Sequence, residues 1–385
     1  MTHVLNTEEL LSCLVGFDST SRNSNLPIAE FICNYLDRPG IRVERSQAPR
    51  DGKVNLIISA GPDCDGRRDG LVLSGHMDVV PAEEPDWLSD PFTLTRIGER
   101  LVGRGACDMK GFLALAMNAV ASAKPTDLTR PLVLVFTYDE EVGTVGAQHF
   151  AKTWPDAAAL PKNAIVGEPT SLRVIRMHKG HLEFSVAVSG ESAHSGYPHL
   201  GRNAIEPVGR LITALTDLRR EFESEPQPYA EYFPEVPFVA LNVARISGGT
   251  AINIVPDRCV LQCGIRLLPG MDKESTVDRL RHLVVQSLDD AYYEFDLTGE
   301  APPMLLAESA PIYQALCTEV GQNGTLSASY ATDAGWFQSV GMQCAIFGPG
   351  SIEVAHKPNE SILEQELHQA SEILQRIVHQ FCVVG

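Results

Sequence analysis

Short, uninterrupted apolar runs alternate with amphipathic stretches along the first half of the chain, and this alternation constrains the fold more than any other feature. A strand that is apolar at nearly every residue is covered on both faces, as in parallel sheets flanked by helices. Strand-like runs occupy 55–61, 70–80, 132–137 and 163–169, and helix-like stretches occupy 7–17, 28–40, 110–123 and 145–154. This order predicts an α/β fold, a mostly parallel sheet with helices on both faces.

The pattern changes near residue 178. Segments 181–190, 238–249, 260–268 and 293–299 are typical of strands, and 203–224 and 273–288 are typical of helices. Their order, β-α-β-β-α-β, is that of a ferredoxin-like module. Beyond residue 300 the chain returns to the α/β pattern. We therefore predict a larger domain formed by 1–177 and 300–385, with a smaller α+β domain, 178–299, inserted into it.

Bulk composition excludes several classes of protein. The chain has 385 residues, 44% of them hydrophobic, which is enough for about two globular domains. Its net charge of −18 argues against nucleic acid and anionic membranes as partners, because both attract positive charge. The first residues contain no basic segment followed by a long apolar run, so we expect no signal peptide and no membrane span. Nine scattered cysteines without a CxxC pair favour a reduced, cytoplasmic location.

Acidic and histidine side chains recur where the apolar strands end. Each alone is weak evidence, because a single histidine on an apolar strand is usually a hydrogen-bonded core residue and a single glutamate there is usually solvated. Ligands of open α/β sheets bind beyond the carboxyl ends of the strands, however, so side chains in this position converge. The residues concerned are His76, Asp78, Asp108, Glu140, Glu141, Glu168 and His356. Their shared position predicts a metal site.

Spacing predicts different tasks for neighbouring residues. His76 and Asp78 are two apart on a strand and point to the same side, so Asp78 can accept the second ring N–H of a metal-binding His76. Asp78 can equally be a turn residue before Pro81. Glu140 and Glu141 diverge in an extended chain, so one fits a metal ligand and the other a general base. Asp139 has no role that its spacing assigns.

The number of donors indicates a pair of ions. Two histidines and three carboxylates satisfy two metal ions that each take one histidine and one terminal carboxylate and share a third carboxylate. Mixed nitrogen and oxygen donors suit zinc, and they leave cobalt and manganese open. A mononuclear enzyme that uses only some of these donors is the alternative. The donors are His76, His356, Asp108, Glu141 and Glu168.

Several stretches together resemble the M20 family of co-catalytic zinc peptidases and deacylases. They are "SGHMDVVP", "GRGACDMKGF", "DEEVGTVGA", "GEPT", "SAHSGYPHLGRNAI" and "GPGSIEVAHKPNE", in the family's order. The resemblance implies that one ion is held by His76, Asp108 and Glu168, and the other by Asp108, Glu141 and His356. It also implies that Glu140 is the general base, that Asp78 orients His76, and that the Asp108–Met109 peptide is cis.

The same resemblance assigns tasks to the inserted domain. It implies that this domain covers the site as a lid and forms a homodimer, and that His194 reaches the partner subunit's active site to steady the oxyanion. Arg266 and Asn253 would bind the substrate, Arg266 as a clamp on its carboxylate. Lys179 and Thr332 are further candidates for substrate contact. Without the resemblance, Arg266 reads equally as a surface ion-pair partner and Asn253 as a turn residue.

Within the family, "IVGEPTSLRVIRMHKGH", "IRLLPGM" and "DPFTLT" are most similar to the branch that deacetylates N2-acetyl-L-ornithine. That branch releases L-ornithine and acetate in arginine biosynthesis. The stretches "MHKGHLE" and "ATDAGWF" depart from the succinyl-diaminopimelate desuccinylases. A desuccinylase, an acetylcitrulline deacetylase, another aminoacylase or a dipeptidase remain alternatives within the family. A catalytically silent binding protein is the alternative outside it, although such a chain is expected to have lost a ligand or the base.

Overall fold

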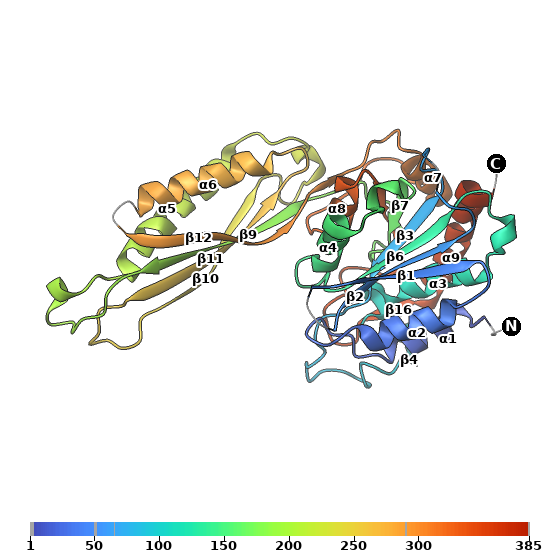
Figure 1. Ribbon diagram of the computed structural model, residues 1–385, viewed down its shortest axis with the longest axis horizontal. Coiled ribbons are helices and arrows are strands. Elements are labelled where there is room, and N and C mark those ends of the chain that lie inside the picture. The colour runs from blue at the N-terminus through green and yellow to red at the C-terminus, as the bar shows by residue number, and fades with distance from the viewer. Residues whose placement is uncertain (1–3, 50–51, 65, 289–290, 384–385) are drawn as a thin grey trace. The chain divides into compact units, whose positions relative to one another are not determined.

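The computed structural model describes residues 4–49, 52–64, 66–288 and 291–383. The chain divides into two compact units, each visible in Figure 1. Unit 1 comprises Met1–Arg176, Leu306–Leu326 and Thr332–Gly385, and unit 2 comprises Met177–Leu305 and Ser327–Ala331. The sequence indicated an insertion at 178–299, whereas the chain also returns to unit 2 for residues 327–331.

Unit 1 is built on a six-stranded sheet. Its strand order is β1 (Ile41–Gln47), β2 (Val54–Ala60), β6 (Leu132–Thr137), β3 (Leu71–His76), β7 (Asn163–Val166) and β15 (Gln343–Ile346). β6, β3, β7 and β15 pair in parallel, whereas β2 is antiparallel to both of its neighbours, β1 and β6. Because β2 alone runs against the other strands, the predicted mostly parallel sheet is confirmed. Every residue of β3, β6 and β7 is buried, as their continuous apolar sequences predicted.

Helices flank both faces of this sheet (Figure 1). They are α1 (Thr7–Val15), α2 (Leu26–Leu36), α3 (Gly111–Ser122), α4 (Val145–Thr153), α7 (Pro311–Val320), α8 (Ala334–Ser339) and α9 (Glu364–Val378). α3 contacts β3 and packs against α1, α2 and α9, while α4 packs against β2 and α8. α1 begins with a capping box, in which the Asn6 side chain accepts the Glu9 N–H and the Glu9 side chain accepts the Asn6 N–H.

A small antiparallel sheet in unit 1 leads into the candidate site. Its order is β16 (Ser361–Leu363), β5 (Arg100–Val102) and β4 (Thr95–Ile97). β5 is followed by a buried helical turn, Ala106–Lys110, which contains Asp108 and continues directly into α3. The other short helical turns are Pro125–Asp127, Ala157–Ala159, Pro198–Leu200, Ala230–Tyr232 and His379–Val383.

Unit 2 has the ferredoxin-like order that the sequence predicted. Its elements are β9 (Gly180–Ser189), α5 (Ile205–Ser224), β10 (Ala240–Gly248), β11 (Arg258–Leu267), α6 (Lys273–Ser287) and β12 (Tyr292–Ala301). The sheet order is β10-β11-β9-β12, with every pair antiparallel. Alternate residues of β9 are buried and join α5 and α6 in a separate hydrophobic core. A second small sheet has the order β13 (Met304–Leu305), β8 (Met177–His178) and β14 (Ser327–Ala328).

Strand β1 is the main element of the large sheet that the sequence did not indicate. Within the described part of the chain it pairs only with β2, at the edge of the sheet, and it carries Arg42, Glu44 and Arg45. An edge strand in which only one residue is buried lacks the apolar run that identifies its neighbours. Among the described residues, no helix combines the length and the apolar character needed to cross a lipid bilayer.

Candidate metal centre

The carboxyl ends of adjacent parallel strands bring the predicted ligands together. β3 ends at His76, and its neighbours β6 and β7 lead to Glu141 and Glu168, respectively. β15 lies beside β7 and leads into the loop that carries His356. Asp108 is delivered from outside the sheet, by the turn that precedes α3. All five of these residues belong to unit 1.

Asp108 lies between the two histidines. Its Oδ1 is 3.1 Å from the Nε2 atom of His76, and its Oδ2 is 3.3 Å from the Nε2 atom of His356. The same His356 nitrogen is 3.0 Å from Oε2 of Glu141. One carboxylate thus presents a separate oxygen to each histidine, which is the arrangement of a bridging ligand.

The donors form two groups that share Asp108. His76, Asp108 and Glu168 make one group, and Asp108, Glu141 and His356 make the other. In each group the candidate ligand atoms lie within 4.8 Å of one another. Each group offers one imidazole nitrogen and two carboxylates, a donor set that suits zinc and related divalent ions.

The buried carboxylates of the site repel one another, and a positive charge among them would stabilise their ionised forms. Burial, and then the charge of Glu168, raises the pKa of Glu140 well above its ordinary value. Burial and the charge of Asp108 do the same for Glu168 and raise the pKa of Glu141. One oxygen of Glu168 is buried and has no hydrogen-bond partner among the described residues. An orphaned buried oxygen inside an acidic cluster fits a divalent cation.

Without a metal ion, protons on the histidines carry the positive charge. Hydrogen bonds to Asp108 and then to Glu141 raise the pKa of His356 to about 10. Burial opposes charge on His76, but the hydrogen bond to Asp108 and the charge of Glu140 raise its pKa well above the ordinary value. Metal ions bind neutral imidazole, so binding at this site releases these protons.

Asp78 contacts the site differently from the way its spacing suggested. The ring N–H at Nδ1 of His76 donates to the main-chain carbonyl of Asp78 at 2.9 Å, whereas the Asp78 carboxylate is 3.7 Å away. This bond leaves Nε2 of His76 available to a metal ion. The Asp78 carboxylate instead accepts the backbone N–H groups of Glu140 and Glu141, at 3.0 and 3.3 Å, and the Ser21 hydroxyl at 2.7 Å. It therefore positions the two glutamates.

Asp139, to which spacing assigned no role, belongs to neither donor group. Its carboxylate forms a buried ion pair with Lys53, 86 positions earlier in the chain. Its φ of 52° is in the left-handed region, which is uncommon for a residue other than glycine. A contact over this sequence distance leaves no local pattern, so it could not be predicted from the sequence.

Glu360 is a further residue that the sequence did not single out. Its Oε1 accepts the backbone N–H groups of Cys107 and Asp108, at 2.9 and 3.0 Å, and its Oε2 accepts Nη1–H of the fully buried Arg104 at 2.8 Å. Glu360 thus holds the turn that carries Asp108. The Asp108–Met109 peptide within that turn is cis, which confirms this implication of the resemblance.

Thr332 was predicted as a substrate contact, but its side chain is fully buried. Its hydroxyl oxygen accepts the Ala334 N–H at the start of α8, at 3.1 Å. The next residue, Asp333, is also buried and accepts the Thr137 hydroxyl at 2.5 Å. Thr137 is the last residue of β6 and pairs with His76, so Asp333 contacts the end of a strand that neighbours His76.

The other predicted substrate contacts belong to unit 2. His194 and Asn253 are exposed and lie on adjacent segments, because the Ser195 N–H donates to the Asn253 carbonyl at 2.9 Å. Arg266 is partly buried on β11, opposite His181 of β9. Lys179 is buried, and its ammonium donates to the main-chain carbonyls of Val236 and Phe238. Those bonds occupy Lys179 in holding a loop of its own unit.

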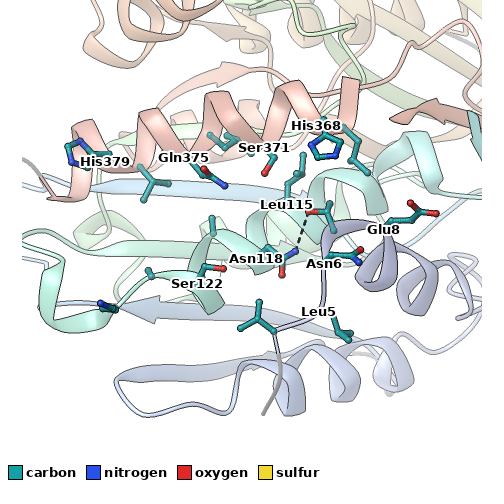
Figure 2. Close-up of a pocket in the computed structure, with 18 of the residues that line it drawn as sticks. Leu5, Asn6, Glu8, Leu115, Asn118, Ser122, His368, Ser371, Gln375 and His379 are labelled. Atoms are coloured by element: carbon teal, nitrogen blue, oxygen red, sulfur yellow. Dashed lines mark hydrogen bonds between the residues drawn. The ribbon is translucent and has the colours of Figure 1, made fainter. Parts of the chain in front are cut away.

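A cavity in unit 1 is separate from this centre. It has a volume of about 920 Å³ and lies between α3, α9 and the start of α1. Figure 2 shows Asn118 and Ser122 of α3 on one side and His368, Ser371 and Gln375 of α9 on the other. None of the candidate metal ligands lines this cavity.

Comparisons with known proteins agree with this geometry. The model of peptidase family M20/M25/M40 matches residues 72–380. An acetylornithine deacetylase from Proteus mirabilis is 34% identical over 381 residues, which cover 95% of this chain and 92% of that protein. An acetylornithine deacetylase from Edwardsiella ictaluri is 34% identical over 387 residues, which cover 97% of each chain.

Solved structures share the fold over nearly the whole chain. An M20 family metallo-carboxypeptidase from Sulfolobus solfataricus matches with a TM-score of 0.75 at 17% identity, covering 98% of this chain and 99% of that one. A dinuclear metal-binding peptidase of the M20 family from Bacillus subtilis matches with a TM-score of 0.67 at 13% identity, covering 97% of both chains.

Proposed function

Because this chain belongs to peptidase family M20/M25/M40 and is a hydrolase of that family, we propose that it hydrolyses the acetyl amide of N2-acetyl-L-ornithine to L-ornithine and acetate. The observation that carries the proposal is the pair of donor groups that share Asp108, in a chain about a third identical to acetylornithine deacetylases. Arginine biosynthesis in the cytoplasm is the corresponding setting.

Two divalent ions, zinc by preference and cobalt as the alternative, are the proposed cofactors. His76 and Glu168 would hold one ion, Glu141 and His356 the other, and Asp108 would bridge them. When bound, such a pair lowers the pKa of a shared water and polarises the amide carbonyl. Glu360 holds the backbone of Asp108, and the Asp78 carbonyl holds the ring of His76. These two candidate ligands therefore have fixed orientations before a metal ion binds.

Glu140 is the proposed general base. It is the neighbour of the ligand Glu141, and its backbone N–H is held by Asp78. Glu140 would accept a proton from the attacking water as the new C–O bond forms, and would donate that proton to the nitrogen as the C–N bond breaks. Without metal ions, burial and the charge of Glu168 raise the pKa of Glu140 above its ordinary value.

Unit 2 supplies the groups proposed to bind substrate and partner. Arg266 has the planar guanidinium that suits a carboxylate, and Asn253 and His194 offer exposed polar groups on adjacent segments. We propose that His194 acts on the site of a second subunit in a homodimer, steadying the oxyanion. Exposed apolar side chains of unit 2, among them Leu200, Ile246 and Ile252, support an interface there.

A substrate panel tests this function. Purified protein is treated with a chelator, reloaded with zinc or cobalt, and assayed on acetylornithine, acetylcitrulline, succinyl-diaminopimelate and a set of dipeptides. We expect metal-dependent release of acetate, with the highest kcat/KM on acetylornithine. A higher kcat/KM on the succinylated substrate or on a dipeptide would overturn the substrate assignment. Activity that survives complete metal removal would overturn the mechanism.

A further inference from the structure

A buried ion pair lies beside the two functional glutamates. The ammonium of Lys53 contacts the carboxylate of Asp139, and the two residues are only 6% and 8% exposed. Lys53 also donates to the main-chain carbonyl of Ser21 at 2.7 Å. Removing a lysine and an aspartate from water costs free energy that their mutual attraction offsets only in part. Stability alone therefore does not explain why this pair is buried.

The ion pair closes a ring of contacts around the glutamates. The Ser21 hydroxyl donates to the Asp78 carboxylate at 2.7 Å, and that carboxylate accepts the N–H groups of Glu140 and Glu141. The chain then runs from Glu140 back to Asp139, which contacts Lys53, which in turn contacts Ser21. The backbone of Glu140 and Glu141 is thus held by two contacts. Asp78 binds their N–H groups, and Lys53 binds the side chain of the preceding residue, Asp139.

Asp139 is the residue that turns the chain between the strand and the glutamates. It lies between the end of β6 and Glu140 and has a left-handed φ of 52°. Its carbonyl accepts the Val145 N–H at 3.1 Å. A non-glycine residue keeps this backbone conformation only where its surroundings hold it. The Lys53 ammonium supplies such a hold on the Asp139 side chain.

We propose that Lys53 and Asp139 are positioning residues that set the directions of Glu140 and Glu141. The ion pair keeps the third carboxylate of the run occupied, so that Asp139 does not compete with Glu141 for a metal ion. It also fixes the turn that sends Glu140 and Glu141 in different directions. The catalytic part of this inference rests on the proposed hydrolase function, whereas the structural part is independent of it.

Substitution of the pair tests the inference in the metal-loaded protein. We expect Lys53→Met and Asp139→Asn each to lower kcat by about 10–100-fold on acetylornithine, with KM changed less than about 3-fold, the size expected when geometry rather than binding is lost. The double variant should be no slower than the worse single variant, because both changes break one contact. Lys53→Arg, which keeps the charge, should recover part of kcat.

A second measurement does not depend on turnover. In the metal-free protein, amide hydrogen exchange of residues 138–144 should be about 10-fold faster in both variants than in the unsubstituted chain, while α4 stays unchanged. Ile377→Ala, a change in a buried residue of α9 that touches none of these contacts, is the control for lost stability. It should leave both kcat and this exchange unchanged at temperatures where the protein is folded.

The outcomes separate the two proposals. If folded Lys53→Met or Asp139→Asn protein keeps normal kcat and normal exchange at 138–144, the positioning role is wrong. Should Lys53→Met fail to fold, Ser21→Ala removes one hydroxyl from the same ring, and normal exchange in Asp139→Asn and Ser21→Ala together would reject the role. A third outcome is that the unsubstituted protein hydrolyses no amide in the panel while the variants still show faster exchange at 138–144. That outcome would retain the positioning role and reject the proposed function.

Discussion

Glu140 and Glu141 are neighbours in the chain, yet the structure gives their carboxylates different surroundings. Glu141 contacts His356 and belongs to one of the two donor groups, whereas Glu140 belongs to neither. Both backbone N–H groups are held by Asp78. The Asp78 carboxylate therefore holds the backbone of both the candidate ligand Glu141 and the candidate base Glu140.

Replacement of Glu140 should remove catalysis without removing metal. Glu140→Gln keeps the size of the side chain but has no basic oxygen, so we expect kcat to fall by about 10²–10⁴-fold, the usual contribution of a general base. Metal analysis should still find two ions per chain. Glu141→Gln is the matched control, because it should lose one ion as well as activity. Retention of most activity by Glu140→Gln would show that the base lies elsewhere.

Relative to the metal-loaded protein, the metal-free protein should lose stability as the pH rises. Burial raises the folded-state pKa values of Glu140 and Glu168, so folding is penalised wherever the unfolded chain has already ionised them. The pKa of His356 is raised from 6.5 to about 10, so the stability it contributes is complete below its unfolded value and is lost as the pH approaches 10. The three effects have the same sign.

Urea unfolding at several pH values between about pH 5 and about pH 9 measures this dependence. The free energy of unfolding of the chelated protein should fall with pH relative to that of the metal-loaded protein. The metal-loaded protein should show a flatter profile, because the ions replace the protons. An equal pH dependence of the two forms would contradict the electrostatic account of the site.

At the residue scale, the sequence located the candidate ligands better than the residues that support them. His76, Asp108, Glu141, Glu168 and His356 follow strands or open a helix, so local pattern locates them. Glu360 and the Lys53–Asp139 pair act through contacts between distant segments, which no local pattern records. The Asp78 carboxylate was expected to bind the imidazole of His76. In the structure it binds backbone N–H groups, a difference that depends on how the chain turns after β6.

At the scale of elements, Gly167 allows α3 to pack close to the end of β7. Gly167 directly precedes the candidate ligand Glu168. A Cβ atom on Gly167 would lie 1.9 Å from Cγ of the buried Phe112. The Phe112 ring belongs to α3, which also follows the turn that carries Asp108. The absence of a side chain at Gly167 thus lets α3 lie close enough for Asp108 and Glu168 to share one donor group.

Gly167→Ala should therefore damage the fold and the metal site together. We expect a loss of about 3 kcal/mol in the free energy of unfolding, the upper end of the usual cost of overpacking, and weaker metal binding. Gly209→Ala in α5 is the control, since nothing lies within 4 Å of its added Cβ. Addition of Phe112→Leu should recover part of the loss. An unchanged unfolding midpoint and unchanged metal affinity in Gly167→Ala would contradict this packing.

The elements themselves were predictable to the extent that they are buried. β3, β6 and β7 have apolar sequences because both faces are covered, and α3 and α5 have clear helical stretches. β1 has alternating charges at the sheet edge and was missed. β8, β13 and β14 have two residues each, too few for a period to be visible.

At the scale of the whole molecule, most of unit 2 is one continuous segment, 177–305, and residues 327–331 are its remaining part. The Leu306 N–H donates to the Arg176 carbonyl at 2.8 Å, so the residues that flank the segment 177–305 are adjacent in unit 1. The five candidate ligands are all in unit 1. His194, Asn253 and Arg266 are all in unit 2.

Replacement of residues 177–305 by a short Gly/Ser linker should divide metal binding from turnover. The shortened chain should bind two metal ions, as judged by metal analysis after gel filtration, because no candidate ligand is lost. Its activity on acetylornithine should fall by at least about 10³-fold, because the proposed oxyanion and carboxylate contacts are removed. Full-length His194→Asn is the companion variant and should be impaired with both units present. Substantial turnover by the shortened chain would contradict the role given to unit 2.

The placement of His356 after the inserted unit affects when the site is completed during synthesis. Chains emerge from the ribosome N-terminus first, and domains fold as units. His76, Asp108 and Glu168 have all emerged before residue 177, but His356, Glu360 and strand β15 follow more than a hundred residues later. Until then, β7 lacks its outer neighbour and Asp108 lacks the carboxylate that holds its backbone. A chain that ends before His356 thus lacks a donor of the second group and cannot assemble the complete pair of sites.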